Sequence, residues 1–327
     1  MERTTDASER PRATLTQGDE ALGCYLLRKT KNFYDADVLR SRNPDVLKDA
    51  DVVLDVGAEY APERHRFDHH QKDFSEVFGR GFHTKLSSAG LVYKHFGKEI
   101  IANELGLDKE DPKVDLVWIN VYRNFVEAVD AIDNGINRYD TDAPPRYSDN
   151  TGLSSRVGSL NPEWFEPCGP DEQMARFREA MELTGKEFMD AVRYVAKVWL
   201  PAREIVQKSM EDRFKVDESG SIVTLSQYCP WKSHMEQLEV EQGIEGKILY
   251  CLYEDQAHKW RIQALAAQPG SFESRKALPE QWRGLRDEEL SKECGIEGCV
   301  FVHSSGFIGG NHTYEGALAM AKKALFM

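Results

Sequence analysis

The chain has 327 residues, of which 41% are hydrophobic and 30% are charged, and it carries a formal net charge of −13 at pH 7. A chain of this length holds about two domains of roughly 150 residues each, and none of its apolar runs approaches the roughly 18 residues that a membrane span needs, so no transmembrane segment is predicted. The acidic balance excludes a protein that coats nucleic acid through a broad basic surface, but it allows an enzyme with a local basic groove and bound metal cations.

The first 15 residues are polar, mixed in charge and interrupted by proline, which predicts a disordered tail. The acidic residues Glu2, Asp6 and Glu9 are atypical of a mitochondrial presequence, which is poor in acids. Six cysteines are scattered along the chain without a Cys-x-x-Cys pair, and no secretory signal opens it. This pattern favours a reducing compartment.

A β/α alternation begins after the tail. Apolar residues at helical spacing predict a helix at 19–31, and strands follow at 36–39 and 52–56. The second strand is almost continuously apolar, as expected for a strand buried on both faces of a parallel sheet, and Asp55 interrupts it just before Gly57. The sequence therefore predicts an α/β fold whose mostly parallel sheet carries an acidic residue at its carboxyl edge.

The rest of the chain divides into a helical part and a part with short strands. Helices are predicted at 87–96, 114–132 and 172–214, and Pro201 interrupts the last of them. After a turn signal at 217–220, β-like runs occur at 222–225, 247–253, 260–264 and 299–303. We place a domain boundary near residue 215. This gives a tail at 1–15, a first domain at 16–214 that includes the connecting helix, and a smaller α+β domain at 215–327.

The last segment combines a glycine-rich stretch with a helix. The stretch from Ser305 to His312 leads into a helical run at 315–325. A strand, a glycine loop and a helix can form an anion cradle, because glycines let backbone N–H groups approach a ligand and the helix N-terminus adds partial positive charge. The alternative is an ordinary turn. Just before it, Cys294, Cys299 and His303 are an incomplete zinc set, and we interpret the cysteines as buried core thiols.

Two groups of residues near the predicted sheet offer metal ligands. Asp55 stands at the carboxyl end of a buried strand, where open α/β sheets place their ligand sites. The run from His65 to His70 contains three histidines and Asp68, which supply the nitrogen and oxygen donors that transition metals favour. The alternatives are a capping residue for the first group and a solvated polar loop for the second.

Two groups of acidic residues lie at helix ends. Glu127, Asp130 and Asp133 share one face near the end of a helix, where a bound cation would offset their unfavourable place on the helix dipole. The alternative is a solvated acidic face. Asp19 and Glu20 open the first helix, where acids are favoured whatever the function.

These groups together resemble successive motifs of the DHH phosphoesterase superfamily. The matching motifs are Asp55 in Val-Leu-Asp-Val-Gly, Asp68-His69-His70 and Asp130-Ala-Ile-Asp133-Asn-Gly. The wider sequence is closer still to the melanocyte proliferating gene (Myg) exonuclease branch. The segments that carry this resemblance extend from residue 19 to the end: Asp19-Glu20-Ala21-Leu22, residues 84–90, Cys229-Pro230-Trp231-Lys232, residues 282–286 and the loop at 305–310.

The resemblance implies an N-terminal α/β/α domain that holds one or two Mn²⁺ or Mg²⁺ ions. It also implies a C-terminal DHH-associated domain that binds the substrate. For the Myg branch it implies 3′ to 5′ exonuclease action on single-stranded RNA, in mitochondria and the nucleus. It sets no oligomeric state.

The resemblance also assigns roles to residues of the first domain. The implied metal ligands are four acids and one histidine: Asp19, Asp55, His69, Asp133 and Asp130. Asp55 bridges two cations that lower the pKa of a shared water, and Asp133 is preferred to Asp130 because it lies nearest the turn. His70 contacts or protonates the reacting phosphate, while Asp68 orients a ligating histidine.

Other residues are candidates for contact with substrate phosphates. They are Lys85 and Arg156 in the first domain, and Gly309, Gly310, Asn311 and His312 in the second. Four further cations either extend a basic track or are solvated surface. These are Arg275, Lys276, Arg283 and Arg286.

One part of the family pattern is missing. The family opens with His-x-x-x-x-His-x-Asp-Glu, but here only Asp19-Glu20 stands, and no histidine precedes His65. Loss of direct ligands weakens metal binding by more than the roughly 10- to 100-fold typical of outer residues, so we predict one weakly bound cation and low or absent activity. Two other interpretations stay open: a phosphoesterase of small molecules or short oligonucleotides, and a catalytically inactive RNA-binding protein.

Overall fold

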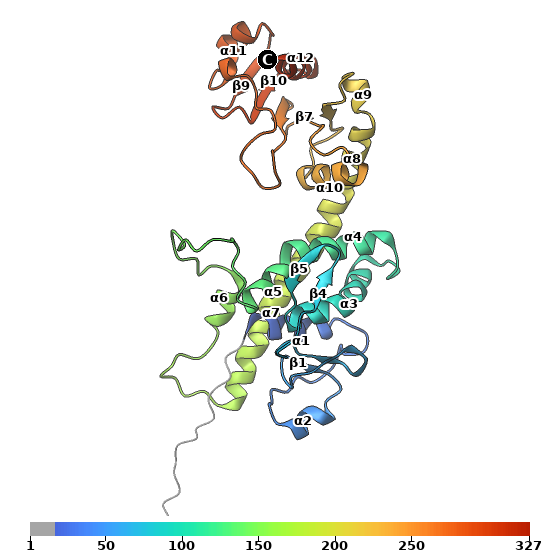
Figure 1. Cartoon of the computed structure of the whole chain (residues 1–327), viewed down its shortest axis with the longest axis vertical. Coiled ribbons are helices and arrows are strands. Elements are labelled where there is room, and N and C mark those ends of the chain that lie inside the picture. Colours follow the sequence, from blue (N-terminus) through green and yellow to red (C-terminus); the bar gives the residue numbers. More distant parts are fainter. Residues whose placement is uncertain (1–16) are drawn as a thin grey trace, which may run out of the picture. The chain divides into compact units, whose positions relative to one another are not determined.

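The computed structural model describes residues 17–327, which form two compact units that divide between Ala196 and Lys197 (Figure 1). The division lies inside the long helical run that the sequence assigned as a connector, and the predicted tail at 1–15 lies outside the described residues. Both units combine helices with strands, so the predicted α/β class is confirmed. No helix in the described part of the chain has the length and hydrophobicity to cross a membrane.

The first unit is mainly helical and contains one small sheet. The sheet has the order β1-β3-β2, with β1 parallel and β2 antiparallel to β3, and β4 and β5 form a separate hairpin. Its elements are α1 (Gly18–Leu27), α2 (Pro44–Asp49), β1 (Val53–Leu54), β2 (Tyr60–Ala61), η1 (Pro62–Arg64), β3 (Arg66–Phe67), β4 (Val77–Gly79), β5 (Phe82–Lys85), α3 (Ser88–Leu105), α4 (Pro112–Val121), η2 (Tyr122–Val126), α5 (Glu127–Asp133), α6 (Leu153–Gly158) and α7 (Pro170–Tyr194).

Two predicted strands of this unit differ from the structure. The strand predicted at 36–39 is wrong, because Val38 packs instead against the hydrophobic cluster that joins α1, α6 and α7, and Leu39 stays 72% exposed. The strand predicted at 52–56 is shortened to β1. Asp55 takes a φ of 61° and turns the chain out of the sheet.

Helix α1 is fixed by close contacts on both sides. A Cβ atom at Gly23 would lie 2.7 Å from Leu54 of β1, and a Cβ atom at Gly185 of α7 would lie 2.2 Å from the ring of Tyr25. Only glycine allows both approaches, because any larger side chain would push the neighbours apart. The start of α1, which carries Asp19, is thereby held beside the end of β1.

The helix predicted at 172–214 is interrupted directly before Pro201. Helix α7 ends at Tyr194, a π-helical turn η3 covers Val195–Trp199, and α8 begins at Leu200. Proline lacks an N–H group and its ring clashes with the preceding turn, and a widened π turn removes that clash. The helix predicted at 114–132 likewise passes through a π turn, η2, between α4 and α5.

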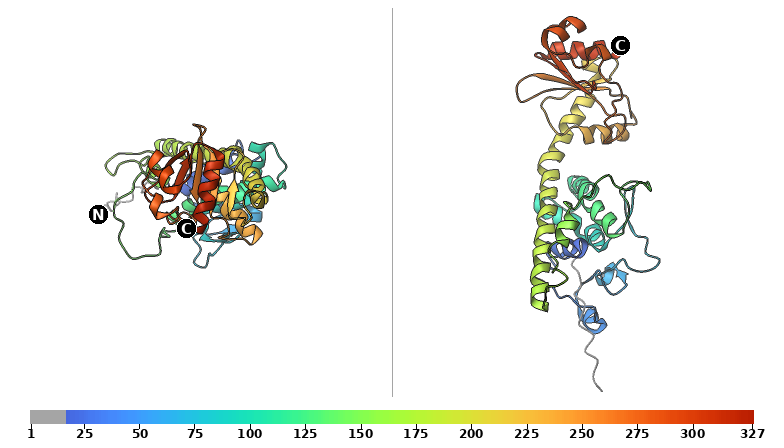
Figure 2. Two further views of the ribbon diagram at one scale, coloured as in Figure 1. Left: turned by 90° about the horizontal axis from the view of Figure 1, so that it is seen from above. Right: turned by 90° about the vertical axis from the view of Figure 1, so that its left-hand side faces the viewer.

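The second unit is built on a five-stranded sheet of order β6-β7-β8-β10-β9. Figure 2 shows this unit in yellow, orange and red, from two further sides. Strands β6 and β7 are parallel and the other pairs are antiparallel. Its elements are α8 (Leu200–Glu211), α9 (Arg213–Val216), β6 (Ile222–Thr224), α10 (Lys232–Gln242), β7 (Tyr250–Glu254), β8 (Trp260–Ala264), η4 (Glu280–Trp282), α11 (Asp287–Cys294), β9 (Cys299–Val302), β10 (Ile308–Asn311) and α12 (Tyr314–Phe326). The sequence leaves α10 and α11 unassigned.

Alternate residues of this sheet face two layers of helices. Tyr250 and Leu252 of β7 lie in a core with α11 and α12, whereas Cys251 and Tyr253 of the same strand lie in a core with α8 and α10. Successive side chains of a strand point to opposite faces, so one apolar strand serves both cores. The second unit is therefore a sheet covered by helices on both faces.

The segment predicted as a glycine loop contains a strand. A turn at Gly306, with a φ of 75°, leads into β10, which pairs with β8 and β9. A Cβ atom at Gly309 would lie 3.1 Å from the carbonyl oxygen of Phe301, and one at Gly310 would lie 3.0 Å from that of Trp260. Close packing inside the sheet thus explains both glycines.

The cysteines beside this strand are core thiols. Cys294 and Cys299 are buried with their Sγ atoms 3.2 Å apart, and burial raises the pKa of Cys299 to about 12. His303 instead bonds to Ser305 through Nδ1. Both side chains belong to the hydrophobic core of the second unit, so the interpretation as buried core thiols is confirmed.

Candidate metal centre

Asp55 is held on a strained turn at the end of β1. Its backbone has a φ of 61°, Gly57 follows at 95° and Ala58 at 51°. Non-glycine residues rarely adopt this left-handed region, and such strain gathers at functional sites where the surroundings over-determine the backbone. The side chain is fixed by Ser88 at the start of α3, whose Oγ donates to Asp55 Oδ1 at 3.0 Å.

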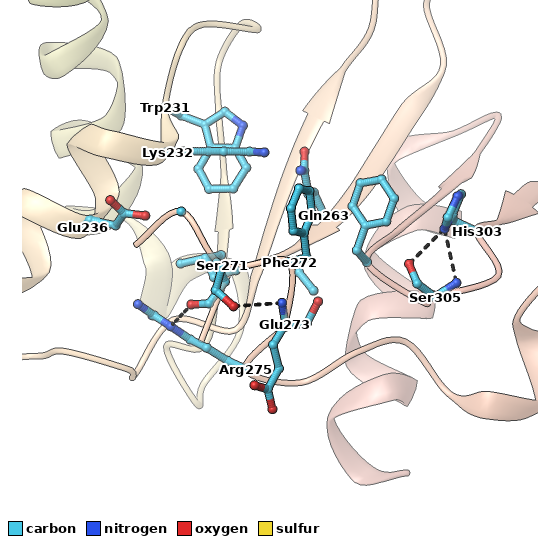
Figure 3. A pocket seen from close by; sticks show the side chains of 16 residues that line it. Trp231, Lys232, Glu236, Gln263, Ser271, Phe272, Glu273, Arg275, His303 and Ser305 are labelled. Atoms are coloured by element: carbon cyan, nitrogen blue, oxygen red, sulfur yellow. Dashed lines mark hydrogen bonds between the residues drawn. The ribbon is translucent and has the colours of Figure 1, made fainter. Parts of the chain in front are cut away.

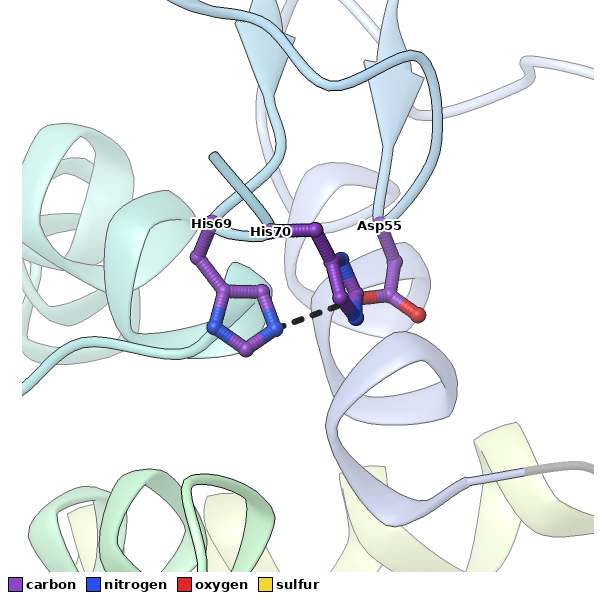
Figure 4. A group of neighbouring side chains, drawn as sticks. All are labelled: Asp55, His69 and His70. Atoms are coloured by element: carbon purple, nitrogen blue, oxygen red, sulfur yellow. Dashed lines mark ion pairs between the residues drawn. The ribbon is translucent and has the colours of Figure 1, made fainter. Parts of the chain in front are cut away.

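His69 lies between two carboxylates. Its Nε2 atom is 3.1 Å from Asp133 Oδ2. The same atom is 3.5 Å from Asp55 Oδ1, and Figure 4 shows this pair beside His70. Although burial opposes it, these two acids raise the pKa of His69. His69 therefore belongs to two groups of potential ligands whose donor atoms all lie within 4.8 Å of one another: Asp55, His69 and His70, and Asp19, His69 and Asp133.

Asp19 is the most unusual member of the cluster. It is 2% exposed, and neither of its carboxylate oxygens has a hydrogen-bond partner among the described residues. Burial raises the pKa of Asp19, and so do the charges of Asp55 and Asp133. A buried carboxylate must be paired, protonated or bound to a cation.

The cluster has the composition of a divalent-cation site. Nδ1 of His69, like the oxygens of Asp19, is buried without a hydrogen bond in the part of the chain that the structure describes. Burial and the charge of Asp55 also raise the pKa of Asp133, because like charges disfavour ionisation. A cation would satisfy these atoms and remove the repulsion at once. The residues present therefore fit a hard or borderline divalent ion.

Asp68 orients His70. Its Oδ1 atom lies 2.6 Å from His70 Nδ1 and accepts from the His70 backbone N–H at 3.1 Å, while Oδ2 accepts from the Ala58 N–H at 2.6 Å. Against the effect of burial, these bonds lower the pKa of Asp68. The carboxylate is thus ionised near neutral pH and fixes a proton on His70 Nδ1. The imidazole of His70 is 58% exposed.

Asp130 is separated from the cluster. It accepts hydrogen bonds from the Ser87 N–H at 3.0 Å, from Ser87 Oγ at 2.7 Å and from the Tyr122 hydroxyl at 2.9 Å. Burial raises the pKa of Asp130 to about 7. The geometry thus groups Asp133 with the ligands, as the sequence preferred, and gives Asp130 a structural place between α5 and the start of α3.

The chain matches known proteins along nearly its whole length. A family model for MYG1 exonucleases, described as "Uncharacterised protein family (UPF0160)", matches residues 17–325. The chain belongs to this family. The predicted resemblance to the Myg exonuclease branch is confirmed.

Named relatives agree with this assignment. MYG1 exonuclease of Mus musculus is 49% identical over 313 residues, which cover 94% of this chain and 82% of the relative. The human MYG1 exonuclease is 48% identical over the same shares, and MYG1 protein of Dictyostelium discoideum is 47% identical over 94% of this chain and 93% of its own length. No solved structure matches the chain.

Two predicted substrate contacts of the first unit lie in different surroundings. Lys85 ends β5, and its charge acts on His69, while its Nζ lies 5.4 Å from the centre of the Phe74 ring. Arg156 lies on α6 and pairs with Glu187 of α7. The structure brings Lys85 to the cluster but ties Arg156 to a neighbouring helix.

The other predicted contacts belong to the second unit. Gly309, Gly310 and Asn311 are buried in β10, where Asn311 Nδ2 donates to the Glu297 carbonyl at 2.8 Å, and His312 is exposed beyond the strand. A cavity of about 560 Å³ in this unit is lined by Ser305 and Phe307, which precede β10, and by Trp231, Lys232 and Phe272 (Figure 3).

The four cations considered for a basic track are mostly engaged with the protein. Arg275 pairs with Glu239 and donates to two carbonyls, Lys276 donates to the Leu325 carbonyl and Arg283 to that of Leu278. Arg286 lies over the Phe301 ring. Three of them therefore brace the fold.

Sequence reasoning missed Ser88 as a partner of Asp55. Both Ser87 and Ser88 stand in the segment at 84–90 that carried part of the family resemblance, and each binds a different aspartate. The doubled serine was the available signal. Its meaning emerges only when α3 is placed against the end of β1.

Proposed function

We propose that this protein is a metal-dependent phosphodiesterase that acts as a 3′ to 5′ exonuclease on single-stranded RNA. The observation that carries the proposal is the buried, unpartnered carboxylate of Asp19 beside His69, Asp55 and Asp133. Nothing in the described fold offsets the charge of these acids as well as a divalent cation would. The names of the mammalian relatives support the exonuclease activity.

The two ligand groups define where Mn²⁺ or Mg²⁺ would bind. Asp19, His69 and Asp133 would hold an ion, and Asp55 beside His69 and His70 would supply a further carboxylate ligand. Such ions stabilise charge on phosphoryl oxygens and lower the pKa of water. Ser88 keeps Asp55 in place through its hydroxyl, and the strained turn after β1 keeps the carboxylate out of the sheet.

His70 is the residue that exchanges protons with the reacting phosphate. Asp68 holds the proton on Nδ1, which leaves Nε2 as the working atom of an exposed ring. Asp68 acts through His70, as the carboxylate does in other oriented histidines. Lys85, at the end of β5, supports negative charge on the substrate.

The missing first motif lowers the expected activity. In the family pattern two histidines precede Asp19, and the second of them would stand at Gln17. Gln17 is exposed, and its backbone N–H donates to Glu20 at the start of α1. With Asp19 left as the one ligand from this motif, the first ion binds weakly. Mitochondria and the nucleus are the compartments we propose from the family.

A calorimetric titration tests the proposal. Mn²⁺ is titrated into the chain and into a variant with histidines restored at positions 12 and 17, and both are assayed on an RNA ladder labelled at the 5′ end. We expect weak binding and slow shortening from the 3′ end for the chain, and tight binding with faster cleavage for the restored variant. Absence of metal-dependent cleavage in both proteins would overturn the exonuclease proposal.

A second candidate function is favoured by the same missing histidines. A chain that lacks direct metal ligands could keep the fold and bind RNA without cleaving it. RNA binding in EDTA, with no product in Mn²⁺ even at high enzyme concentration, selects this alternative. Faster hydrolysis of dinucleotides than of longer strands selects instead the phosphoesterase of short substrates.

A further inference from the structure

A cavity of about 800 Å³ in the first unit adjoins the metal centre. Its wall includes Asp55, Asp68 and His70, and it continues over residues from the segment before α2, from α2 itself and from the turn after β1. Its size is in the range of ordinary ligand pockets. The metal centre therefore opens into a space large enough for more than a single phosphate group.

The wall of this cavity contains four cations, two of which are already engaged. Arg66 donates to the carbonyls of Ala50 and Arg64, each at 3.0 Å, and of Leu47 at 3.3 Å, so that it braces α2 against β3. Arg64 pairs with Glu59. The engaged pair stabilises the wall and offers little charge to a ligand.

The other two cations, Arg42 and Lys48, also line the cavity. Both side chains are exposed, and neither makes a hydrogen bond or ion pair with any described residue. Lys48 also stands in the last turn of α2, where a cation is favoured by the helix dipole alone. Arg42 lies in the irregular segment before α2, and its charge also favours the ionised form of Glu20 in α1.

Part of the cavity wall is apolar. Val53 is buried, and Leu47 and Val56 are partly buried, and all three line the cavity. A pyrophosphate or other small anion gains nothing from such a surface. A nucleoside gains from it, because a base has an apolar face and carries phosphates on its sugar.

We infer that this cavity is a nucleotide subsite, in which the Leu47, Val53 and Val56 surface receives a base and Arg42 and Lys48 bind the phosphates of the adjoining nucleotides. The inference rests on the proposed function and deepens it, because it selects an RNA strand over a small phosphate ester.

Fluorescence anisotropy with a labelled single-stranded RNA tests the charge. The strand is titrated in Ca²⁺, and a gel verifies that it stays intact. In the variant R42Q/K48Q we expect at least tenfold weaker binding and a salt dependence of log Kd that is lower by about 1.4, since each phosphate contact on a single strand contributes about 0.7. Equal slopes in wild type and variant would overturn the inference, as would no binding by the wild type.

The matched control removes the same charge from another part of the first unit. Lys109 and Lys113 are exposed, lie at the α3–α4 connection and do not line the cavity. We expect K109Q/K113Q to leave the affinity and the salt slope unchanged. If this control weakens binding as much as R42Q/K48Q does, the attraction comes from overall charge and the subsite is wrong.

A second variant tests the apolar wall. L47S should weaken binding of the intact strand severalfold and leave an abasic strand of equal length unaffected, with thermal melting used to verify folding. An equal loss for both strands contradicts a base at Leu47. These binding measurements do not depend on cleavage, so they test the subsite separately from the exonuclease proposal. If the chain binds RNA through the cavity but shows no cleavage in the Mn²⁺ assay, the exonuclease proposal is wrong and the subsite stands.

Discussion

The carboxylate of Asp130 lies directly against the backbone of Gly90. A Cβ atom at position 90 would come within 2.2 Å of Asp130 Oδ1 and 2.5 Å of Oδ2. This contact joins α5 to α3, and the same carboxylate accepts from Ser87 and Tyr122. The helix that ends at Asp133 is therefore positioned through Asp130, three residues earlier.

Gly90→Ala should destabilise the first unit. The added methyl group must displace Asp130 and break its bonds to Ser87 and Tyr122, so we expect a loss of about 1–3 kcal/mol, typical of an overpacked core. Gly158→Ala is the matched control, because no atom lies within 4 Å of a Cβ at that position. Urea unfolding of both variants is the measurement, and equal midpoints would refute the contact.

Asp130 should give the protein a pH-dependent stability. Its folded pKa is about 7, against an ordinary value of 3.8, because the carboxyl is buried. The folded state therefore binds the proton more tightly than the unfolded state does. The resulting stabilisation of the folded state is fully present below about pH 4 and is lost as the pH rises through 7. Across this pH range the free energy of unfolding should fall by on the order of 4 kcal/mol through Asp130.

The comparison for this effect is Asp130→Asn, with both proteins unfolded in EDTA between pH 4 and 8. The stability of wild type relative to the variant should fall across this interval and level off above about pH 7. A relative stability that stays constant would mean that Asp130 is ionised in the folded protein throughout.

The sequence motifs contain the members of the candidate metal centre, but their arrangement depends on the fold. Asp55 stands at the end of the strand predicted at 52–56, but no strand was predicted before His69. The parallel pairing of β1 with β3, which brings both residues to one edge of the sheet, therefore could not be predicted. The choice between Asp130 and Asp133 does not follow from spacing, since residues three apart share a helix face. What separates them is the packing of α3, which buries Asp130 at Ser87.

The cavity cations could not be predicted from the sequence. Arg42 lies in an irregular segment whose course depends on where Asn43 and Pro44 begin α2, and no motif marks it. The strand at 36–39 failed for a related reason, because Val38 found a place in the α1–α7 core instead of a sheet neighbour. Tertiary packing sets the conformation in both cases, and local sequence propensity predicts structure poorly at such positions.

His234 should make the second unit sensitive to acid. It is fully buried, its Nε2–H donates to the Trp199 carbonyl at 2.6 Å, and Nδ1 has no partner among the described residues. Burial lowers its pKa to about 4 from 6.5. The unfolded chain therefore binds more protons between these values, and the stability that His234 contributes is present above pH 6.5 and lost as the pH falls through 4.

His234→Gln tests this contribution by unfolding between pH 4 and 7, followed by tryptophan fluorescence. The slope of stability against pH should be smaller in the variant than in the wild type. His258→Gln is the control, because His258 is exposed and bonds to Glu254. If the control flattens the slope equally, the acid sensitivity has another origin.

Asp19 should destabilise the metal-free protein and strengthen its binding of Mn²⁺. In the absence of metal its unpartnered carboxylate repels Asp55 and Asp133, so Asp19→Asn should raise the melting temperature in EDTA by about 2–4 °C, corresponding to roughly 1 kcal/mol. With Mn²⁺ the wild type should instead have the higher melting temperature. An ion at 100 times its Kd stabilises the folded state by about 2.7 kcal/mol, and the variant should bind the ion more weakly. Asp51→Asn removes a charge from an exposed position outside the cluster and should change neither value. If Asp19 served only to begin α1, its substitution would lower the melting temperature under both conditions. If it is a metal ligand, the substitution should raise the melting temperature in EDTA and lower it in Mn²⁺.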